Sequence, residues 1–150
     1  MKMIAFACDH LAVDLKKELM EYVGSLGYEC RDYGANSTER VDYPDYALAA
    51  ADAVVSGECD RGILICGTGV GIGIAANKVK GIRCVTCSDC YSAKMSREHN
   101  DANMISIGAR VVGNELAKMI IKAWLDAEFE GGRHQVRVDK IMSIERTGKI

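Results

Sequence analysis

The sequence predicts an α/β fold, a three-layer α/β/α sandwich built on a five-stranded parallel Rossmann-like sheet and completed by a C-terminal helix. Short apolar runs alternate with amphipathic stretches from one end of the chain to the other. Several of these runs are continuously apolar, which is typical of strands covered on both faces. Strands that alternate with helices in this way predict right-handed crossovers and helices on both faces of the sheet.

Each apolar run is assigned to a strand and each amphipathic stretch to a helix. The strands are expected at 3–8, 28–33, 62–66, 82–87 and 103–107. The helices are expected at 12–26, 45–56, 71–79, 89–98 and 113–128, and Pro44 suits the first turn of the second helix. After the Gly131-Gly132 break, apolar residues from Val138 to Ile144 predict a further helix.

The composition predicts a single domain over residues 1–150, since 49% hydrophobic content is ample for one core. A net charge of -2 gives no general attraction to nucleic acid or to an anionic membrane, so an anionic ligand needs a local basic cluster. The N-terminal apolar run is too short for a signal peptide or a membrane span, and we expect a cytoplasmic protein.

Seven scattered cysteines, an odd number, favour reduced thiols over a disulfide framework. The run from Cys84 through Cys87 to Cys90 has the spacing of a metal motif. On a strand, however, Cys84 and Cys87 point to opposite faces, and position 94 is Lys where a cluster run needs a fourth cysteine. We therefore expect no metal site and no cofactor.

Open α/β sheets bind ligands at the carboxyl ends of their strands, so functional residues are expected just after each strand. The segments in those places are Asp9-His10, the stretch around Tyr43, 66–71, Ser88-Asp89 and 108–110. Polar and nucleophilic side chains therefore collect at one edge of the predicted sheet.

The segment 66–71, Cys-Gly-Thr-Gly-Val-Gly, joins a buried strand to a helix. Its glycines leave backbone N–H groups free to converge on an anion, and a helix N-terminus adds positive potential. The alternative is a tight turn that needs glycine only for its geometry. Cys66 favours a functional loop, because a thiol at a helix N-terminus has a stabilised thiolate. The commonest role of a free cysteine is that of a small buried hydrophobe, and Cys8, Cys30 and Cys84 fit it better.

A dinucleotide site is a competing interpretation. The residues 71–76 match GxGxxA, and Asp89 lies near the distance expected of a ribose-binding acid. The match follows the third strand instead of the first, and the chain is too short for a second domain that would hold a hydride partner.

His10 and His99 lie in predicted loops, where an imidazole titrates near neutral pH and is suited to acid-base work. A solvated loop histidine is the alternative for both. Arg133 and Arg137 lie four residues apart, with His134 between them, and share one face of a helix. Such a pair can fork onto a phosphate, or it can form an ordinary exposed basic face.

Six strings of residues closely resemble the ribose-5-phosphate isomerase B family, which also contains galactose-6-phosphate and allose-6-phosphate isomerases. The strings are 8–10 (CDH), 42–44 (DYP), 65–71 (ICGTGVG), 96–103 (SREHNDAN), 108–113 (GARVVG) and 131–134 (GGRH). They occur in order over nearly the whole chain.

The resemblance implies interconversion of an aldose phosphate and its ketose through an enediolate, with ribose 5-phosphate and ribulose 5-phosphate as the favoured pair. Cys66 matches the family's base and His99 its ring-opening acid. Some members use a glutamate four residues after this cysteine position, where this chain has Val70. The residues that match substrate contacts are Asp9, His10, Tyr43, Gly67, Thr68, Gly69, Val70, Gly71, Asn100, Arg110, Arg133 and Arg137.

The resemblance also implies a homodimer whose active site is shared across the interface, with a dimer of dimers left open. Leu11-Ala12 and Gly73 depart from the family pattern near the pocket, so six-carbon phosphates such as allose 6-phosphate or galactose 6-phosphate stay open as substrates. A non-catalytic nucleotide-binding module is the remaining alternative, since a fold does not dictate a function. Cys66 together with His99 argues against it, because a sensor needs neither a base nor an acid.

Overall fold

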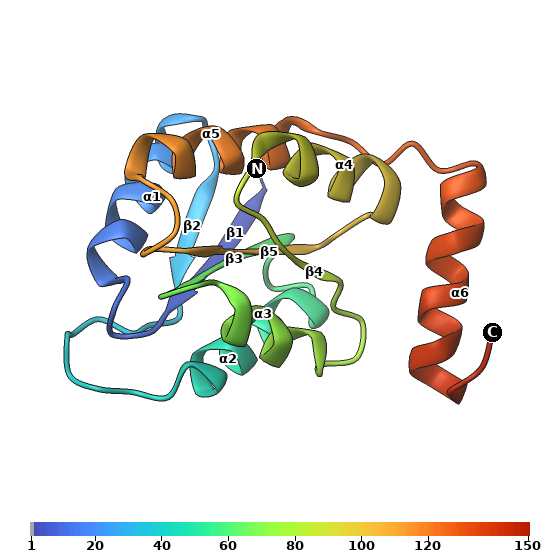
Figure 1. Ribbon diagram of the computed structural model, residues 1–150, viewed down its shortest axis with the longest axis horizontal. Helices are drawn as coiled ribbons and strands as arrows, with labels where there is room; N and C mark the ends of the chain where they lie inside the picture. Colours follow the sequence, from blue (N-terminus) through green and yellow to red (C-terminus); the bar gives the residue numbers. More distant parts are fainter. Residues whose placement is uncertain (1) are drawn as a thin grey trace.

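The computed structural model describes residues 2–150 and contains a five-stranded sheet with six helices (Figure 1). The strands are β1 (Met3–Cys8), β2 (Glu29–Asp32), β3 (Arg61–Cys66), β4 (Cys84–Thr86) and β5 (Met104–Gly108). The helices are α1 (Val13–Ser25), α2 (Tyr43–Val55), α3 (Val70–Asn77), α4 (Cys90–Asn100), α5 (Asn114–Asp126) and α6 (Arg133–Thr147).

All strand pairs are parallel, and the strand order is β2-β1-β3-β5-β4. The predicted α/β fold with a five-stranded parallel sheet and a C-terminal helix is confirmed. The chain moves to one side of β1 for β2 and to the other side for β3, so the order reverses between β1 and β3. A ligand site is expected at the carboxyl ends of these two strands.

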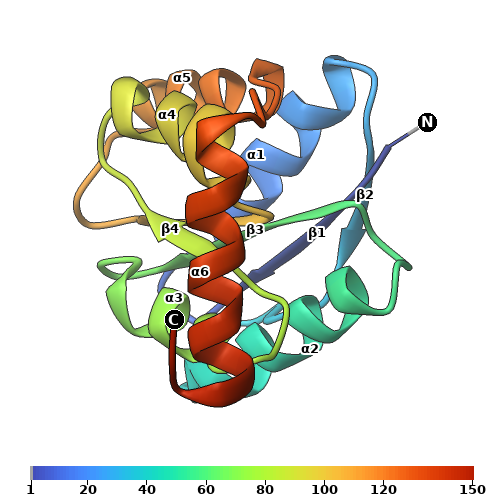
Figure 2. The ribbon, with the colours of Figure 1, turned by 90° about the vertical axis from the view of Figure 1, so that its right-hand side faces the viewer.

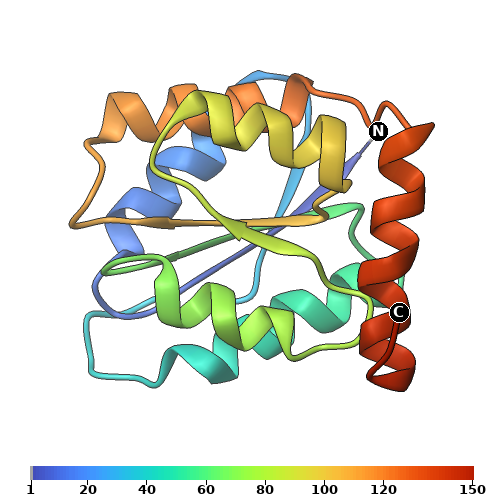
Figure 3. The same ribbon diagram turned by 45° about the vertical axis from the view of Figure 1, so that its right-hand side comes forward.

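Helices cover both faces of the sheet (Figure 3), and a hydrophobic core lies on each face. The core under α1, α4 and α5 is built from large side chains, including Phe6 and Trp124. The core under α2 and α3 contains smaller side chains, and α2 contributes four alanines to it, which let that helix lie close to the sheet. Both faces of the central strands are therefore covered, which explains their continuous apolarity.

The strand β4 is shorter than the predicted segment 82–87. The amide side chain of Asn77 takes both backbone groups of Cys84, each at 2.8 Å, and the Asn103 side chain accepts from the amide of Arg83. Cys84 still pairs with Met104 in the ladder, so these side chains bind the backbone of β4 without replacing its pairing with β5. Cys84 packs in one core and Cys87 in the other, so the expectation that they point to opposite faces is confirmed.

The helix α6 stands at the edge of the molecule next to β4 (Figure 2). Only His134 and Val138 of this helix are buried. Its far end is tied to the body by Glu145, whose carboxylate accepts from the amide of Gly81 at 3.1 to 3.2 Å. No helix within residues 2–150 combines the length and the apolar character needed to cross a bilayer.

Candidate active site

Three strand ends meet at the carboxyl edge of the sheet around Cys66. Cys8 pairs with Ile65, and Cys66 pairs with Gly108. Beyond the strands, the amide of Asp9 donates to the carbonyl of Ile65 at 3.2 Å, and the amide of Ala109 donates to that of Cys66 at 2.8 Å. The segments that follow β1 and β5 are thereby held on either side of Cys66.

The Cys66 thiol is buried and receives a backbone hydrogen bond. The Gly69 amide donates to Sγ at 3.1 Å, and the residue is only 4% exposed. An N–H that donates to sulfur stabilises the negative charge of a thiolate, the form that accepts a proton. The loop therefore brings a backbone N–H donor to the sulfur of Cys66.

Four other thiols are held in the protonated form by their surroundings. Burial raises the pKa of Cys8, Cys30 and Cys87 to about 11, and that of Cys84 to about 12. These cysteines behave as small apolar side chains, as predicted for Cys8, Cys30 and Cys84. All seven cysteines are unpaired, as the scattered odd number predicted.

The glycine-rich loop turns directly into α3. Gly69 caps the helix with φ +78°, and a Cβ placed there would lie 2.7 Å from the backbone of Ile107. Only glycine tolerates both conditions. No side chain caps α3, so the amides of Gly71 and Ile72 have no carbonyl partner inside the helix. These N–H groups are available to an anion next to Cys66.

Side chains from three further segments surround the loop. The Tyr43 ring lies against Gly71 so closely that a Cβ on Gly71 would be 2.5 Å from it. The Arg110 amide donates to the carbonyl of Gly67 at 3.0 Å, which places that arginine beside the loop. His10 Nδ1 accepts from the amide of Val41 at 3.2 Å, so the ring proton of a neutral His10 is on Nε2.

Lys16 was not predicted to have a role, and the structure shows it completely buried behind this edge. Its ammonium donates to Asp32 at 2.6 Å, to the carbonyl of Ala35 at 2.6 Å and to Asn36 at 3.0 Å. It thereby anchors the loop between β2 and α2, which also carries Val41. A signal was present, because Lys16 lies in the apolar stripe that contains Leu19 and Val23.

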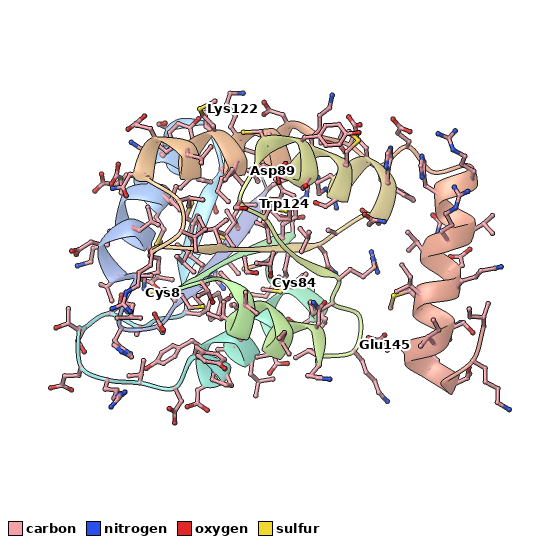
Figure 4. All side chains as sticks on the ribbon, in the orientation of Figure 1. Cys8, Cys84, Asp89, Lys122, Trp124 and Glu145 are labelled. Atoms are coloured by element: carbon pink, nitrogen blue, oxygen red, sulfur yellow. The ribbon has the colours of Figure 1, made fainter. Side chains whose placement is uncertain are left out.

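The other predicted residues lie at the opposite edge of the sheet. His99 and Asn100 end α4, which starts after β4 and runs back toward the amino ends of the strands. Arg133 and Arg137 lie on α6 beside them. The His99 ring stacks on His134 with centroids 4.1 Å apart and planes 10° from parallel. Figure 4 shows the separation, with Cys8 near the carboxyl edge and Glu145 of α6 on the far side.

One protomer therefore brings together Asp9, His10, Tyr43, Arg110 and the loop 66–71, and it holds His99, Asn100, Arg133 and Arg137 elsewhere. The expectation that His99 lies in a loop is wrong, because α4 extends two residues further than predicted and His99 belongs to its last turn. The strand β3 is six residues, about 17 Å, long. A base and an acid acting on one sugar must both reach it within hydrogen-bond distance.

Two features of the dinucleotide interpretation acquire a different structural role. Gly71 and Gly73 lie within α3 and not in the turn before it. Asp89 is the N-cap of α4, and its carboxylate accepts from the amide of Ser92 at 2.7 Å. This bond, which favours the ionised form, holds the pKa of Asp89 below its ordinary value.

Comparison with known proteins identifies close relatives. A family model described as ribose/galactose isomerase matches residues 4–141. Ribose-5-phosphate isomerase B of Escherichia coli is 59% identical over 146 residues, 97% of this chain and 98% of that protein. D-erythrulose-4-phosphate isomerase of Pectobacterium atrosepticum is 49% identical over 147 residues, 97% of each chain.

Solved structures agree with these matches. The structure of Clostridium thermocellum ribose-5-phosphate isomerase B superimposes with a TM-score of 0.95 and 54% identity. The match covers 98% of this chain and 99% of that one. The fold is thus shared over nearly the full length of both chains.

Proposed function

Because this chain belongs to the ribose/galactose isomerase family and is a sugar-phosphate isomerase, we propose that it interconverts ribose 5-phosphate and ribulose 5-phosphate through an enediolate. The observation that carries the proposal is the Cys66 thiol at the switch point of the sheet, with the Gly69 amide donating to it at 3.1 Å. A proton-transfer base and free N–H donors thus share one pocket.

In the proposed reaction, His99 first gives a proton to the ring oxygen of the cyclic sugar. The C1 hydroxyl gives its proton to water, from which His99 is reprotonated, and the C1 aldehyde forms. The Cys66 thiolate then takes the proton from C2. The C–H electron pair forms the C1–C2 double bond, and the carbonyl π pair moves onto the C1 oxygen. A proton passes from the C2 hydroxyl to the C1 oxygen, and Cys66 returns its proton to C1. The product is the ketose, with no net gain or loss of atoms or electrons.

The loop 66–71 is proposed to stabilise the enediolate. The amides of Gly71 and Ile72 are fixed by α3 before substrate arrives, so they need no reorganisation as charge develops. One well-placed donor of this kind accounts for about 10²- to 10³-fold in rate. Asp9, His10 and Tyr43 are proposed to contact the sugar or its phosphate.

The proposed active site is completed by a second copy of the chain, which supplies His99, Asn100, Arg133 and Arg137. Their distance from Cys66 within one protomer supports a site shared across a homodimer. Two features offer surface for that partner. One is a groove of about 480 Å³ between α6 and the edge strand β4, and the other is the set of apolar side chains exposed on α6, such as Val136 and Ile144. We place the enzyme in the cytoplasm, where its unpaired cysteines stay reduced.

The size of the sugar depends on the walls of the pocket. Leu11 is 41% exposed, and its Cδ1 would lie 3.2 Å from a Cβ on Gly67. Leu11 therefore lies beside the loop 66–71, and we propose that its side chain favours a five-carbon over a six-carbon phosphate. The relative that acts on D-erythrulose 4-phosphate extends the range of candidates to four carbons.

A coupled isomerase assay on four-, five- and six-carbon aldose phosphates, with allose 6-phosphate and galactose 6-phosphate among them, tests the proposal. We expect the highest kcat/KM for ribose 5-phosphate. A higher value for another sugar would correct the substrate, and inactivity on every member of the panel would contradict the proposed function.

A further inference from the structure

Three side chains with metal-binding chemistry meet where α4 ends and α6 begins. His99 comes from the last turn of α4, His134 from the first turn of α6 and Glu130 from the turn that joins α5 to α6. One ligand atom of each lies within 4.8 Å of the other two. The Glu130 amide donates to the carbonyl of Glu98 at 3.0 Å, so the backbone fixes this turn against α4.

His134 carries a buried nitrogen without a hydrogen bond. The residue is only 7% exposed, and its Nε2 has no hydrogen-bond partner among residues 2–150. A Glu130 carboxylate oxygen lies 3.3 Å away but outside hydrogen-bond geometry. Burying a polar nitrogen in this way costs free energy unless a further group binds to it. A cation held by both the imidazole and the carboxylate would satisfy both groups.

The charges around His134 favour its neutral form. Burial, followed by the neighbouring His99 and Arg133, lowers the pKa of His134. Neutral imidazole is the form that binds a metal. Arg133 and Arg137 also oppose a cation at this place, and the carboxylate of Glu130 offsets part of their charge. Two imidazoles and one carboxylate are a ligand set typical of Zn²⁺, with a fourth position left for water.

We propose that His99, Glu130 and His134 form a binding site for Zn²⁺, and that the bound ion inhibits the enzyme by occupying the ring of His99. The sequence did not predict this site, because its three residues come from three separate elements. The two rings are stacked, so binding requires the half-exposed His99 ring to rotate until its lone pair points toward Glu130. The inhibitory part rests on the proposed function, whereas the binding of Zn²⁺ does not.

Binding is tested by titrating Zn²⁺ into metal-free protein in competition with a chromogenic chelator. We expect wild-type protein to bind one Zn²⁺ per chain, and Glu130→Gln and His134→Gln to bind it at least about 10-fold more weakly, since even partners of metal ligands cost 10- to 100-fold. Glu128→Gln, in the same turn but outside the cluster, is the matched control and should bind as wild type does.

All four proteins keep the same seven cysteines, so zinc bound to thiols cancels in the comparison. Equal affinity in wild type, Glu130→Gln and His134→Gln would overturn the proposal, as would wild-type protein that binds no Zn²⁺. If His134→Gln does not fold, Glu130→Gln decides alone, because the Glu130 side chain is 50% exposed and its replacement leaves the core intact.

Isomerase activity is measured on the same proteins. Zn²⁺ should inhibit wild type and Glu128→Gln in parallel with binding, while Glu130→Gln should keep its basal activity and need at least about 10-fold more Zn²⁺ for the same inhibition. Zinc bound at the three residues without inhibition would overturn the inhibitory part. Metal-free wild type that is inactive on every sugar phosphate would contradict the proposed function, and the binding titration would still test the zinc site.

Discussion

A mixture of two inactive variants tests whether the active site is shared between chains. Cys66→Ala removes the proposed base at the carboxyl edge of the sheet, and Arg137→Ala removes a proposed phosphate ligand on α6. The strand β3 alone separates the two edges by about 17 Å. This separation is the reason for the proposal that the two residues reach one sugar phosphate from different chains.

The size of the recovery follows from this geometry. After unfolding and refolding of an equal mixture, about half of the dimers contain one chain of each kind. In a mixed dimer with shared sites, one site carries both substitutions and the other carries neither. Half of the dimers are mixed, and each mixed dimer has one intact site out of two. The expected activity of the mixture is therefore about a quarter of the wild-type value.

The assay compares the refolded mixture with each variant refolded alone and with wild type treated in the same way. Losing one charge-assisted phosphate contact costs about 1.5 to 3 kcal/mol, which is roughly 10- to 150-fold in affinity. Arg137→Ala alone must therefore be assayed at low substrate, where this loss is fully visible. Activity of the mixture no higher than the mean of the two variants would refute a site shared by Cys66 and Arg137.

Three further perturbations test single residues. Cys66→Ala should abolish exchange of solvent deuterium into C2 and lower kcat by at least about 10²-fold. The control is Cys30→Ala, which should leave turnover unchanged because it removes a thiol whose pKa is about 11. Near-normal exchange in Cys66→Ala would remove Cys66 as the base. His99→Asn should slow turnover of the cyclic sugar far more than that of an open-chain analogue, and equal losses on both would remove His99 as the ring-opening acid. Asp89→Ala should lower the thermal unfolding midpoint at pH 7. Because the pKa of Asp89 is lowered in the folded protein, the difference in midpoint from wild type should be fully present above about pH 4 and shrink as the pH falls through the lowered pKa. A difference independent of pH would contradict the capping role.

The sequence predicted the strands best where both faces of the sheet are buried. β1 has the predicted bounds, because every residue from Ile4 to Cys8 is enclosed and the run stops at a charged residue. β4 is the least well predicted strand, since the apolar residues Ile82 and Cys87 lie just outside its bounds. Asn77 and Asn103 bind the backbone of residues 83 and 84 from other elements, and no pattern in the apolar run reveals these bonds.

The candidate site was predictable where it depends on local chain geometry. The loop 66–71 combines a strand end, glycines and a helix start within a few residues, and the structure places Cys66 and the Gly69 amide together as that pattern requires. Contacts between distant segments were not predictable. The stacking of His99 on His134 and the bonds of Lys16 depend on tertiary packing, which the spacing of residues along the chain does not encode.

The arrangement of α6 links assembly to catalysis. A helix of 15 residues that buries only His134 and Val138 gains little stability from its own chain. It nevertheless carries Arg133 and Arg137, two of the three arginines, with Arg110, that are proposed to bind the phosphate. Its exposed residues Val136, Ile141 and Ile144 need a covering surface, and the edge strand β4 beside it has a free side. A partner that covers this region would order α6 and bring a second Cys66 to the arginines in the same step. The proposed enzyme is then active only as an assembled dimer, because the base belongs to one chain and the acid and two of the phosphate ligands belong to the other.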